Sequence, residues 1–241
     1  MTPITLDQCR DDVLGIVGGL GPLASAEFLK TIYERSLRGR EQEAPQVIMY
    51  SDPSFPDRTE AIISGNYGGL LDRLESILRG LSFLGATRSV VCCVTAHALF
   101  EKLPADLRAG LISLLDVIFE EIILRPEKRL LICSKGSRTL GLFEAHEHWP
   151  ATSEYIVFPD DHDQDLLHNL IYQIKVLRNV TELAPAFESL LVKYRVNSFI
   201  SGCTEMHIVA KQLGYTSGDP GCIDPLSIIA ERMSESRKEL T

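Results

Sequence analysis

Short, mainly apolar runs alternate with longer amphipathic stretches along the chain. The runs are Val13–Val17, Val47–Tyr50, Ser89–Cys93, Leu130–Cys133, Tyr155–Phe158 and Asn197–Ser201. The stretches with apolar residues at helical spacing are Leu23–Leu37, Leu70–Leu84, Leu107–Leu124, Leu166–Leu177 and Leu183–Tyr194. Runs of this length suit buried strands, and strands that alternate with helices are typical of parallel sheets. The pattern therefore predicts an α/β fold with parallel sheets.

The first run closes on a tight glycine turn, Gly18-Gly19-Leu20-Gly21-Pro22. Glycine and proline mark turns, and Pro22 suits the first turn of a helix, where its missing N–H is not needed. We therefore expect a strand, a turn and a helix in this order over residues 13–37.

Two of the runs lead to a cysteine and then to a threonine. Ser89–Cys93 is followed by Thr95, and the run that leads to Cys203 is followed by Thr204, with the two cysteines 110 positions apart. This repeat at half the chain length predicts two similar α/β lobes. Each lobe would present its cysteine and threonine at the carboxyl edge of its sheet, where open α/β sheets bind ligands.

The length of 241 residues is compatible with two domains of ordinary size. We place the first lobe, with Cys93, in residues 1–112 together with 221–241. The second lobe, with Cys203, would then be residues 113–220.

The charge balance is acidic, with 24 Lys and Arg against 33 Asp and Glu, a formal net charge of −9. No block of basic residues is present, which argues against nucleic acid or an anionic membrane as the partner. The start of the chain lacks the features of a signal peptide, and no apolar run is long enough to span a membrane. We expect a cytoplasmic protein, in which an acidic ligand would need a local cationic or amide-lined spot.

The cysteines are expected to be reduced thiols, because disulfide frameworks belong to smaller secreted chains. They are Cys9, Cys92, Cys93, Cys133, Cys203 and Cys222. Neighbours on a strand point to opposite sides, so Cys92 should lie in the core. Packing is enough to explain Cys9, Cys133 and Cys222.

Six short motifs carry a resemblance to a known family. They are Gly18–Pro22, Ser51-Asp52-Pro53 with Pro56-Asp57-Arg58-Thr59, Cys93-Val94-Thr95-Ala96-His97, Ser134-Lys135-Gly136-Ser137, Gly202-Cys203-Thr204-Glu205 and Ile223-Asp224-Pro225. In this order, over nearly the whole chain, they resemble the aspartate/glutamate racemase superfamily and its aspartate racemase branch in particular. The resemblance implies two α/β lobes related by a pseudo-two-fold axis, with the active site in the cleft between them. It also implies activity without pyridoxal phosphate or metal, and a homodimer.

The resemblance implies that Cys93 and Cys203 are the catalytic residues. It places around the substrate Leu20, Ser51, Arg58, Val94, Thr95, Ser137, Gln164, Thr204 and Glu205. Val94 stands where the family usually has asparagine, and Gln164 stands where some aspartate racemases have a substrate-binding lysine. These departures weaken the expectation of aspartate as substrate more than the expectation of racemisation. Ser137 replaces the usual threonine and keeps its hydroxyl.

Racemisation removes a proton from one face of Cα and returns one to the opposite face, so two fixed groups are simpler than one mobile base. A free thiol titrates at about 8.5, and helix N-termini and neighbouring hydrogen-bond donors can enlarge its thiolate fraction. Hydroxyls and N–H groups at Thr95 and Thr204 can hold a carboxylate. Arg58 can grip the side-chain carboxylate with two parallel hydrogen bonds. By resemblance, Cys203 would act on the L-enantiomer and Cys93 on the D-enantiomer.

Several residues have a second interpretation. Arg58 could instead form a surface ion pair with Asp57, and Ser137 could be an ordinary turn serine. His97 and His207 either tune the thiols or have structural roles. A looser group of acids and histidines consists of His146, His148, His162, Asp160, Asp161 and Asp163. No spacing in that group matches a zinc motif, so we expect no metal.

Two other functions stay open. The turn Gly19–Ala24 fits the GxGxxG/A dinucleotide fingerprint, so an NAD-dependent oxidoreductase is the alternative enzyme. That fingerprint requires an acidic residue about 20 positions on, at the end of the second strand. The first acidic residue after the second apolar run is Asp52, 33 positions beyond Gly19. The other alternative is a catalytically silent amino-acid-binding protein of the same fold. Glutamate or a methylated relative also stays open as substrate.

Overall fold

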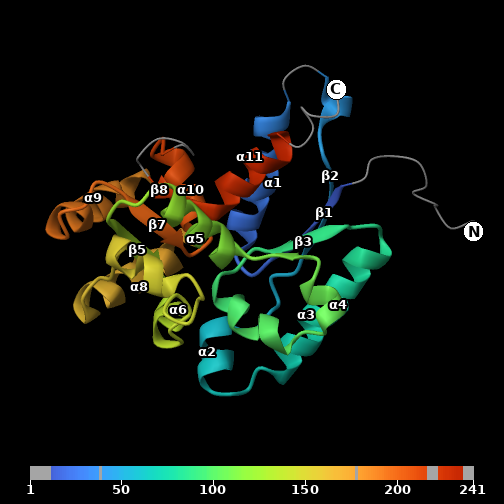
Figure 1. The fold of residues 1–241 in the computed structure, drawn as a ribbon, viewed down its shortest axis with the longest axis horizontal. Helices are drawn as coiled ribbons and strands as arrows, with labels where there is room; N and C mark the ends of the chain where they lie inside the picture. Colours follow the sequence, from blue (N-terminus) through green and yellow to red (C-terminus); the bar gives the residue numbers. More distant parts are fainter. Residues whose placement is uncertain (1–11, 38–39, 177–178, 216–221, 236–241) are drawn as a thin grey trace, which may run out of the picture.

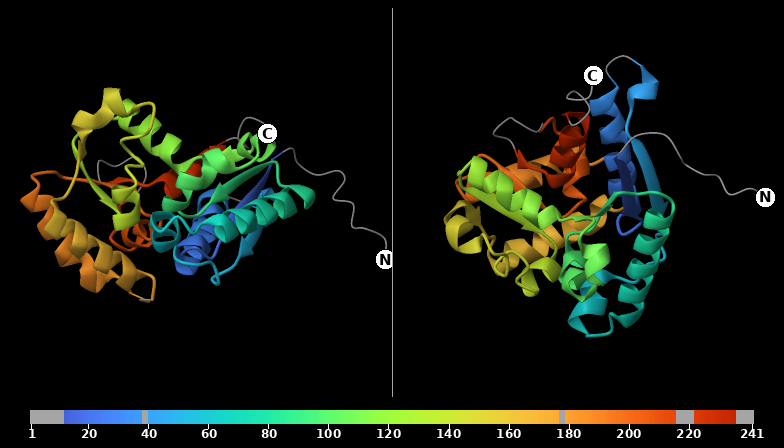
Figure 2. Two further views of the ribbon diagram at one scale, coloured as in Figure 1. Left: turned by 90° about the horizontal axis from the view of Figure 1, so that it is seen from below. Right: turned by 45° about the vertical axis from the view of Figure 1, so that its right-hand side comes forward.

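Two parallel four-stranded sheets form the centre of the molecule (Figure 1). The computed structural model describes residues 12–37, 40–176, 179–215 and 222–235. The strand order is β2-β1-β3-β4 in the first sheet and β6-β5-β7-β8 in the second. The two sheets therefore have the same topology, which confirms the prediction of two similar α/β lobes. Figure 2 shows the two halves of the molecule side by side.

In each sheet, the two central strands end next to each other at the same edge. The first sheet has β1 (Val13–Gly18), β2 (Gln46–Ser51), β3 (Arg88–Val91) and β4 (Leu111–Ile112). The second has β5 (Arg129–Cys133), β6 (Ile156–Val157), β7 (Phe199–Gly202) and β8 (Cys222–Ile223). Val17 of β1 pairs with Val91 of β3, and Cys133 of β5 pairs with Gly202 of β7. The turns that follow β1 and β3, and those that follow β5 and β7, are therefore neighbours.

Helices cover both faces of each sheet. In the first half they are α1 (Pro22–Ser36), α2 (Arg58–Ile63), α3 (Gly68–Phe83), α4 (Ala105–Arg108) and α5 (Leu114–Leu124). In the second they are α6 (Lys135–Thr139), α7 (Trp149–Thr152), α8 (Asp161–Ile174), α9 (Ala184–Lys193), α10 (Met206–Gln212) and α11 (Pro225–Glu235). Ile16 of β1 packs in one cluster with Phe28 of α1, whereas Val17 packs in another with Leu74 of α3. Alternate side chains of a strand point to opposite faces, so α1 and α3 lie on opposite sides of β1.

One hydrophobic cluster crosses from the first sheet to the second. It contains Ile16 of β1, Phe119 of α5, Cys133 of β5 and Ile229 of α11, all at most 2% exposed. Helix α11 also lies alongside α1 (Figure 1). Separating the lobes would expose this shared core, so packing fixes how the two sheets face each other. Cys92 belongs to this cluster and is fully buried, as predicted.

Two details of the chain differ from expectation. The helix predicted over Leu107–Leu124 is wrong, because α4, β4 and α5 occupy this range. Gly110 separates α4 from β4, and Ser113 begins α5 by accepting a hydrogen bond from the backbone N–H of Asp116. Strand β8 pairs with β7 in the second sheet, although the sequence placed these residues with the first lobe.

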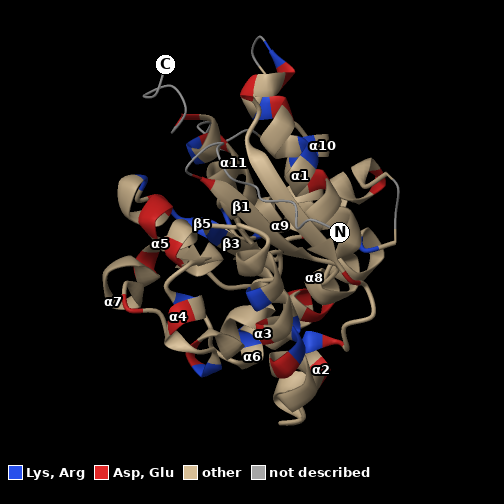
Figure 3. Ribbon diagram, turned by 90° about the vertical axis from the view of Figure 1, so that its right-hand side faces the viewer, with Lys and Arg blue, Asp and Glu red and all other residues tan. Residues whose placement is uncertain are grey.

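Some predictions concern residues that the structure does not describe. Cys9 and the polar start of the chain lie outside the described ranges. Within those ranges, no helix combines the length and apolarity that a membrane span requires. Figure 3 shows acidic and basic residues interspersed over the helices in that view.

Candidate active site

Cys93 and Cys203 occupy equivalent places in the two sheets. Cys93 follows β3 by two residues, and Cys203 follows β7 directly. Each of these strands is the third in its half and lies beside the first. In open α/β sheets this is the point where ligands bind, outside the carboxyl ends of the strands. Both side chains are buried, and the two sulfurs interact electrostatically.

Arg58 supplies a positive charge beside Cys93. It is the first residue of α2 and follows the N-cap Asp57. Burial alone lowers the pKa of Arg58, but the charge and hydrogen bond of Cys93, then the charges of Asp57 and Glu205, raise it overall. The guanidinium is thus a cation inside the candidate site and not a surface ion pair with Asp57.

The remaining contacts of Arg58 fix its guanidinium to the main chain. One terminal nitrogen donates to the carbonyl of Leu20 over 2.5 Å, and the other donates to that of Pro56 over 3.0 Å. The buried Nε atom has no hydrogen-bond partner among the described residues. A guanidinium has five N–H donors, so it keeps donors for a ligand carboxylate.

Glu205 supplies a negative charge beside Cys203. The thiol of Cys203 donates to Oε2 of Glu205 over 2.8 Å. Burial, then the charge and hydrogen bond of Glu205, then the charge of Cys93 raise the pKa of Cys203 well above its ordinary value. Glu205 is only 3% exposed, and its Oε1 atom has no hydrogen-bond partner in the described part of the chain. The two thiols therefore have neighbours of opposite charge.

Hydroxyl groups join the lobes between the two cysteines. Oγ1 of Thr95 lies 3.0 Å from the hydroxyl oxygens of both Ser134 and Ser137, which lie 3.1 Å from each other. Ser134 is the N-cap of α6, and Thr95 begins the 3₁₀ helix Thr95–Lys102. Thr204 donates to the carbonyl of Cys92 over 3.3 Å. These buried hydroxyls offer adjustable donors to an anionic ligand.

One face of α8 carries three polar residues, of which only Gln164 was predicted to lie at the site. Gln164 donates to the carbonyl of Cys133 over 2.9 Å, while its Oε1 finds no partner within the described residues. His168 accepts from the backbone N–H of Lys135, and Tyr172 donates to Asp57. The spacing of four places 164, 168 and 172 on one helix face. His168 and Tyr172 were missed, although this spacing is readable in the sequence.

Two other predicted residues occupy less central positions. Val94 is 2% exposed and joins the shared apolar cluster instead of presenting a polar group. Ser51 ends β2 beside Gly18 and is exposed. Neither has a side-chain hydrogen bond that links it to the thiols.

Close contacts inside the protein explain the glycine turn. Gly19 has φ 88°, and a Cβ atom there would come within 2.2 Å of the backbone of Asp52. A Cβ atom at Gly21 would come within 2.5 Å of Oε1 of Glu205. Gly19 therefore requires glycine for this fold, and Gly21 leaves room for the carboxylate of Glu205. Together with the missing acidic residue, this removes the reason to interpret the turn as a dinucleotide fingerprint.

The histidines after the cysteines contact backbone and buried polar groups. His97 donates from Nδ1 to the carbonyl of Cys93 over 3.0 Å and accepts at Nε2 from the N–H of Leu114 over 2.9 Å. His207 lies 2.6 Å from Asp224 and 2.9 Å from Thr31 of α1. The hydrogen bonds of both rings thus brace the fold and do not reach a sulfur.

The loose group of acids and histidines is dispersed in the structure. His146 lies 3.0 Å from Asp116 and stacks on Phe119, while Asp160 and Asp163 both bind Lys193. Within the described ranges, no three His, Cys, Asp or Glu side chains are grouped so that they could hold a metal ion.

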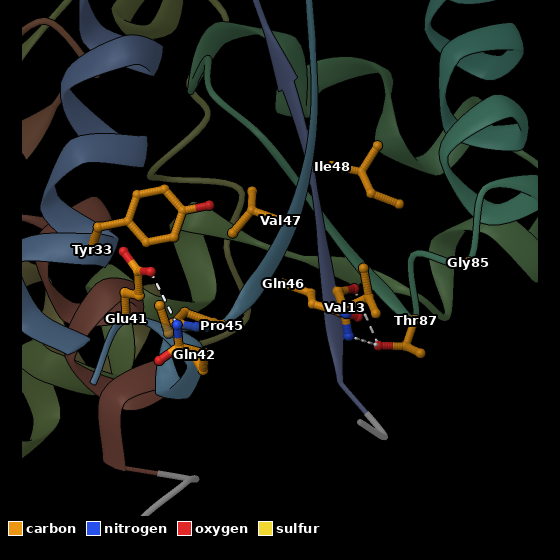
Figure 4. A pocket seen from close by; sticks show the side chains of 11 residues that line it. Val13, Tyr33, Glu41, Gln42, Pro45, Gln46, Val47, Ile48, Gly85 and Thr87 are labelled. Carbon is orange, nitrogen blue, oxygen red and sulfur yellow. Dashed lines mark hydrogen bonds between the residues drawn. The ribbon is translucent and has the colours of Figure 1, made fainter. Parts of the chain in front are cut away.

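A groove of about 640 Å³ lies elsewhere, along β2 (Figure 4). Tyr33, Glu41, Val47 and Thr87 are among its lining residues. None of the residues predicted for catalysis or substrate binding lines it. The groove is therefore separate from the candidate active site.

Three solved structures show the same fold. An aspartate racemase from Picrophilus torridus is 22% identical over 95% of each chain, with a TM-score of 0.77. A glutamate racemase from Francisella tularensis, in complex with D-glutamate, is 15% identical over 95% of this chain and 80% of its own, with a TM-score of 0.59. An allantoin racemase from Klebsiella pneumoniae is 15% identical over 95% and 89%, with a TM-score of 0.55.

The sequence profile of the Asp/Glu/hydantoin racemases matches residues 17–233, which include both cysteine turns, the arginine of α2 and the glycine turn. The chain belongs to the Asp/Glu/hydantoin racemase family.

Proposed function

We propose that this protein interconverts L- and D-aspartate, with Cys93 and Cys203 as proton carriers on opposite faces of the substrate. One observation carries the proposal. Two buried thiols follow equivalent strands of two sheets, and Arg58 lies beside one while Glu205 accepts a hydrogen bond from the other. Two-base racemisation requires one thiolate and one thiol at the moment of binding, and opposite neighbouring charges favour that combination.

In this mechanism Cys93 binds substrate as a thiolate balanced by Arg58, and Cys203 binds it as a thiol. The Cys93 thiolate removes the Cα proton from one enantiomer, and the electron pair delocalises into the substrate carboxylate. The Cys203 thiol then gives its proton to the opposite face. The products are a Cys93 thiol and a Cys203 thiolate, which carry out the reverse reaction. The first state also returns when Cys93 releases a proton to solvent and Cys203 takes one up, with Glu205 accepting the hydrogen bond of the restored Cys203 thiol.

The substrate would be held by groups of both lobes. Arg58 is the group for the side-chain carboxylate, since it keeps free donors. The hydroxyls of Thr95 and Ser137 suit the α-carboxylate, whose charge grows in the transition state. Val94 offers no polar contact, so we expect the preference for aspartate over glutamate to depend on Arg58.

The test is an assay of single enantiomers in D₂O after exhaustive dialysis against a chelator. We expect each enantiomer of aspartate to racemise and to gain deuterium at Cα, with glutamate turned over more slowly. Chiral chromatography and mass spectrometry measure both. Activity that needed added zinc or NADH would contradict the proposed chemistry. Turnover of a hydantoin but of no amino acid would contradict the substrate.

A further inference from the structure

We propose that Tyr172 is a positioning residue for this reaction, because its hydrogen bond to Asp57 fastens α2, the helix that carries Arg58, to the opposite lobe. The inference rests on the proposed function for its kinetic consequences. The contact itself can be tested without turnover.

The hydrogen bond joins two residues 115 positions apart. Oη of Tyr172 donates to Oδ2 of Asp57 over 2.6 Å. Asp57 uses its other oxygen, Oδ1, to accept from the backbone N–H of Glu60 over 3.0 Å, which caps α2. One carboxylate therefore holds the first turn of α2 with one oxygen and α8 of the second lobe with the other.

Helix α2 needs such contacts because it has little core of its own. It has six residues, and only Ala61 among them is buried. Segments with few buried apolar contacts open most readily. Its second tie to the opposite lobe is Thr59, which packs so closely on α6 that a Cβ atom at Gly136 would come within 2.3 Å of Thr59 Oγ1.

Arg58 lies between these two ties. Asp57 binds α8, Arg58 faces Cys93 and the carbonyl of Leu20, and Thr59 packs on α6. Tyr172 also interacts electrostatically with Arg58 and with Cys203, so the phenol borders the candidate site. Release of the Tyr172 contact would let the guanidinium move away from the cleft.

Two variants remove this hydrogen bond in different ways. Tyr172→Phe deletes the donor and keeps the ring, which packs on His168 at 4.5 Å between centroids. Asp57→Ser keeps a good helix N-cap but is too short to reach the phenol. Tyr194→Phe is the matched control, since that phenol donates to Asp163 over 2.7 Å within the second lobe.

We expect Tyr172→Phe and Asp57→Ser each to raise KM for aspartate about tenfold, because the loss of one hydrogen bond to a charged group changes an equilibrium constant by about that factor. We expect kcat to change less than about threefold. Iodoacetamide should alkylate Cys93 of the free enzyme faster in both variants by a similar factor. The double variant should match the single ones, because both remove the same contact. Tyr194→Phe should resemble the wild type.

Wild-type KM and alkylation rates in both variants would overturn the proposal, as would additive effects in the double variant. Thermal melting followed by circular dichroism checks that each variant is folded. If the wild type racemises no amino acid, the proposed function fails, yet the alkylation rates still decide whether the Tyr172–Asp57 contact holds α2 in place beside Cys93.

Discussion

The two cysteine turns have the same place in their sheets and opposite surroundings. The first places its sulfur beside a cation that comes from another element, since Arg58 is 35 positions before Cys93. The second supplies its own acid, Glu205, two positions after Cys203. A repeated fold has therefore kept the backbone frame and diverged in the charge beside each sulfur. Under the proposed mechanism, that difference is what makes one thiol a base and the other an acid.

The histidines that follow the cysteines differ in the same way. His97 is held in a neutral form, because Nδ1 donates to a carbonyl while Nε2 accepts from an N–H. His207 instead contacts the carboxylate of Asp224 and reaches Thr31 in the first lobe. Both residues brace their turns, His97 through the start of α5 and His207 through Asp224 and α1. The predicted choice between thiol tuning and structure is resolved by these contacts in favour of structure.

The largest effect should come from the sulfurs themselves. Cys93→Ser and Cys203→Ser should each lower racemisation at least about 1,000-fold, since each removes the proton carrier of one face. With an aspartate analogue that eliminates a β-leaving group, each variant should still process one enantiomer. Chiral chromatography follows the racemisation of aspartate and the loss of each enantiomer of the analogue.

The same experiment can contradict the assignment of one thiol to each face. If both variants lost both enantiomers equally, the two turns would not have separate roles. Cys222→Ala is the control, because Cys222 pairs with Phe199 at the opposite end of β7.

The next effect should come from the cation of the first turn. Arg58→Gln removes both the counterion of the Cys93 thiolate and a carboxylate ligand, so kcat/KM should fall roughly 100- to 1,000-fold. Arg58→Lys keeps the charge but loses the paired geometry and should recover only part. Steady-state kinetics measure both, with Arg79→Gln as the surface control. A loss of less than threefold in Arg58→Gln would remove Arg58 from the site.

A smaller effect is expected from the acid of the second turn. Glu205→Gln removes one charge and changes one hydrogen bond that raise the pKa of Cys203, while burial, the largest cause, remains. The pKa of Cys203 should therefore fall part of the way towards its ordinary value. Alkylation of Cys203 at pH 8 should become several times faster, and racemisation should slow roughly 10- to 100-fold. Mass spectrometry gives the alkylation rate of each thiol. Slower alkylation of Cys203 would contradict the role of Glu205.

The comparison also shows what sequence can and cannot predict. The order of strands and helices followed from hydrophobic periodicity, and the repeat of cysteine and threonine predicted two similar lobes. β4 and β8 have two residues each, too few for a periodic signal. The apolar residues on both sides of Ser113 concealed the break between β4 and α5. Local periodicity gives no signal for a strand that is no longer than one two-residue repeat. Strand β6 has the same length and was predicted only as part of the longer apolar run Tyr155–Phe158.

At the site, contacts between elements distant in the sequence could not be predicted from local patterns either. The pairing of Arg58 with Cys93, and that of Tyr172 with Asp57, depend on where α2 lies against the second lobe, which no local pattern encodes. Glu205 follows Cys203 by only two positions, but the resemblance gave it only as a substrate-binding residue, so its contact with the thiol also came from the structure. Both turns therefore needed the structure to show which charge lies beside each sulfur.

The smallest expected effect tests the neutral histidine of the first turn. Burial lowers the pKa of His97 to about 4, below the value of about 6.5 in an unfolded chain. The unfolded state therefore binds the extra proton between these values, and stability is lost as pH falls from about 6.5 to 4. The titration of His97 alone should lower the free energy of unfolding by about 2 kcal/mol between pH 7 and pH 5.

The variant His97→Gln can still donate and accept hydrogen bonds but does not titrate. Its free energy of unfolding should therefore be lower than that of the wild type at pH 7 and should fall less towards pH 5. Urea unfolding at both pH values measures this, with His148→Gln, at a side chain 44% exposed, as the control. If His97→Gln loses as much stability between pH 7 and pH 5 as the wild type does, the burial of a neutral ring in the first turn is not what limits acid stability.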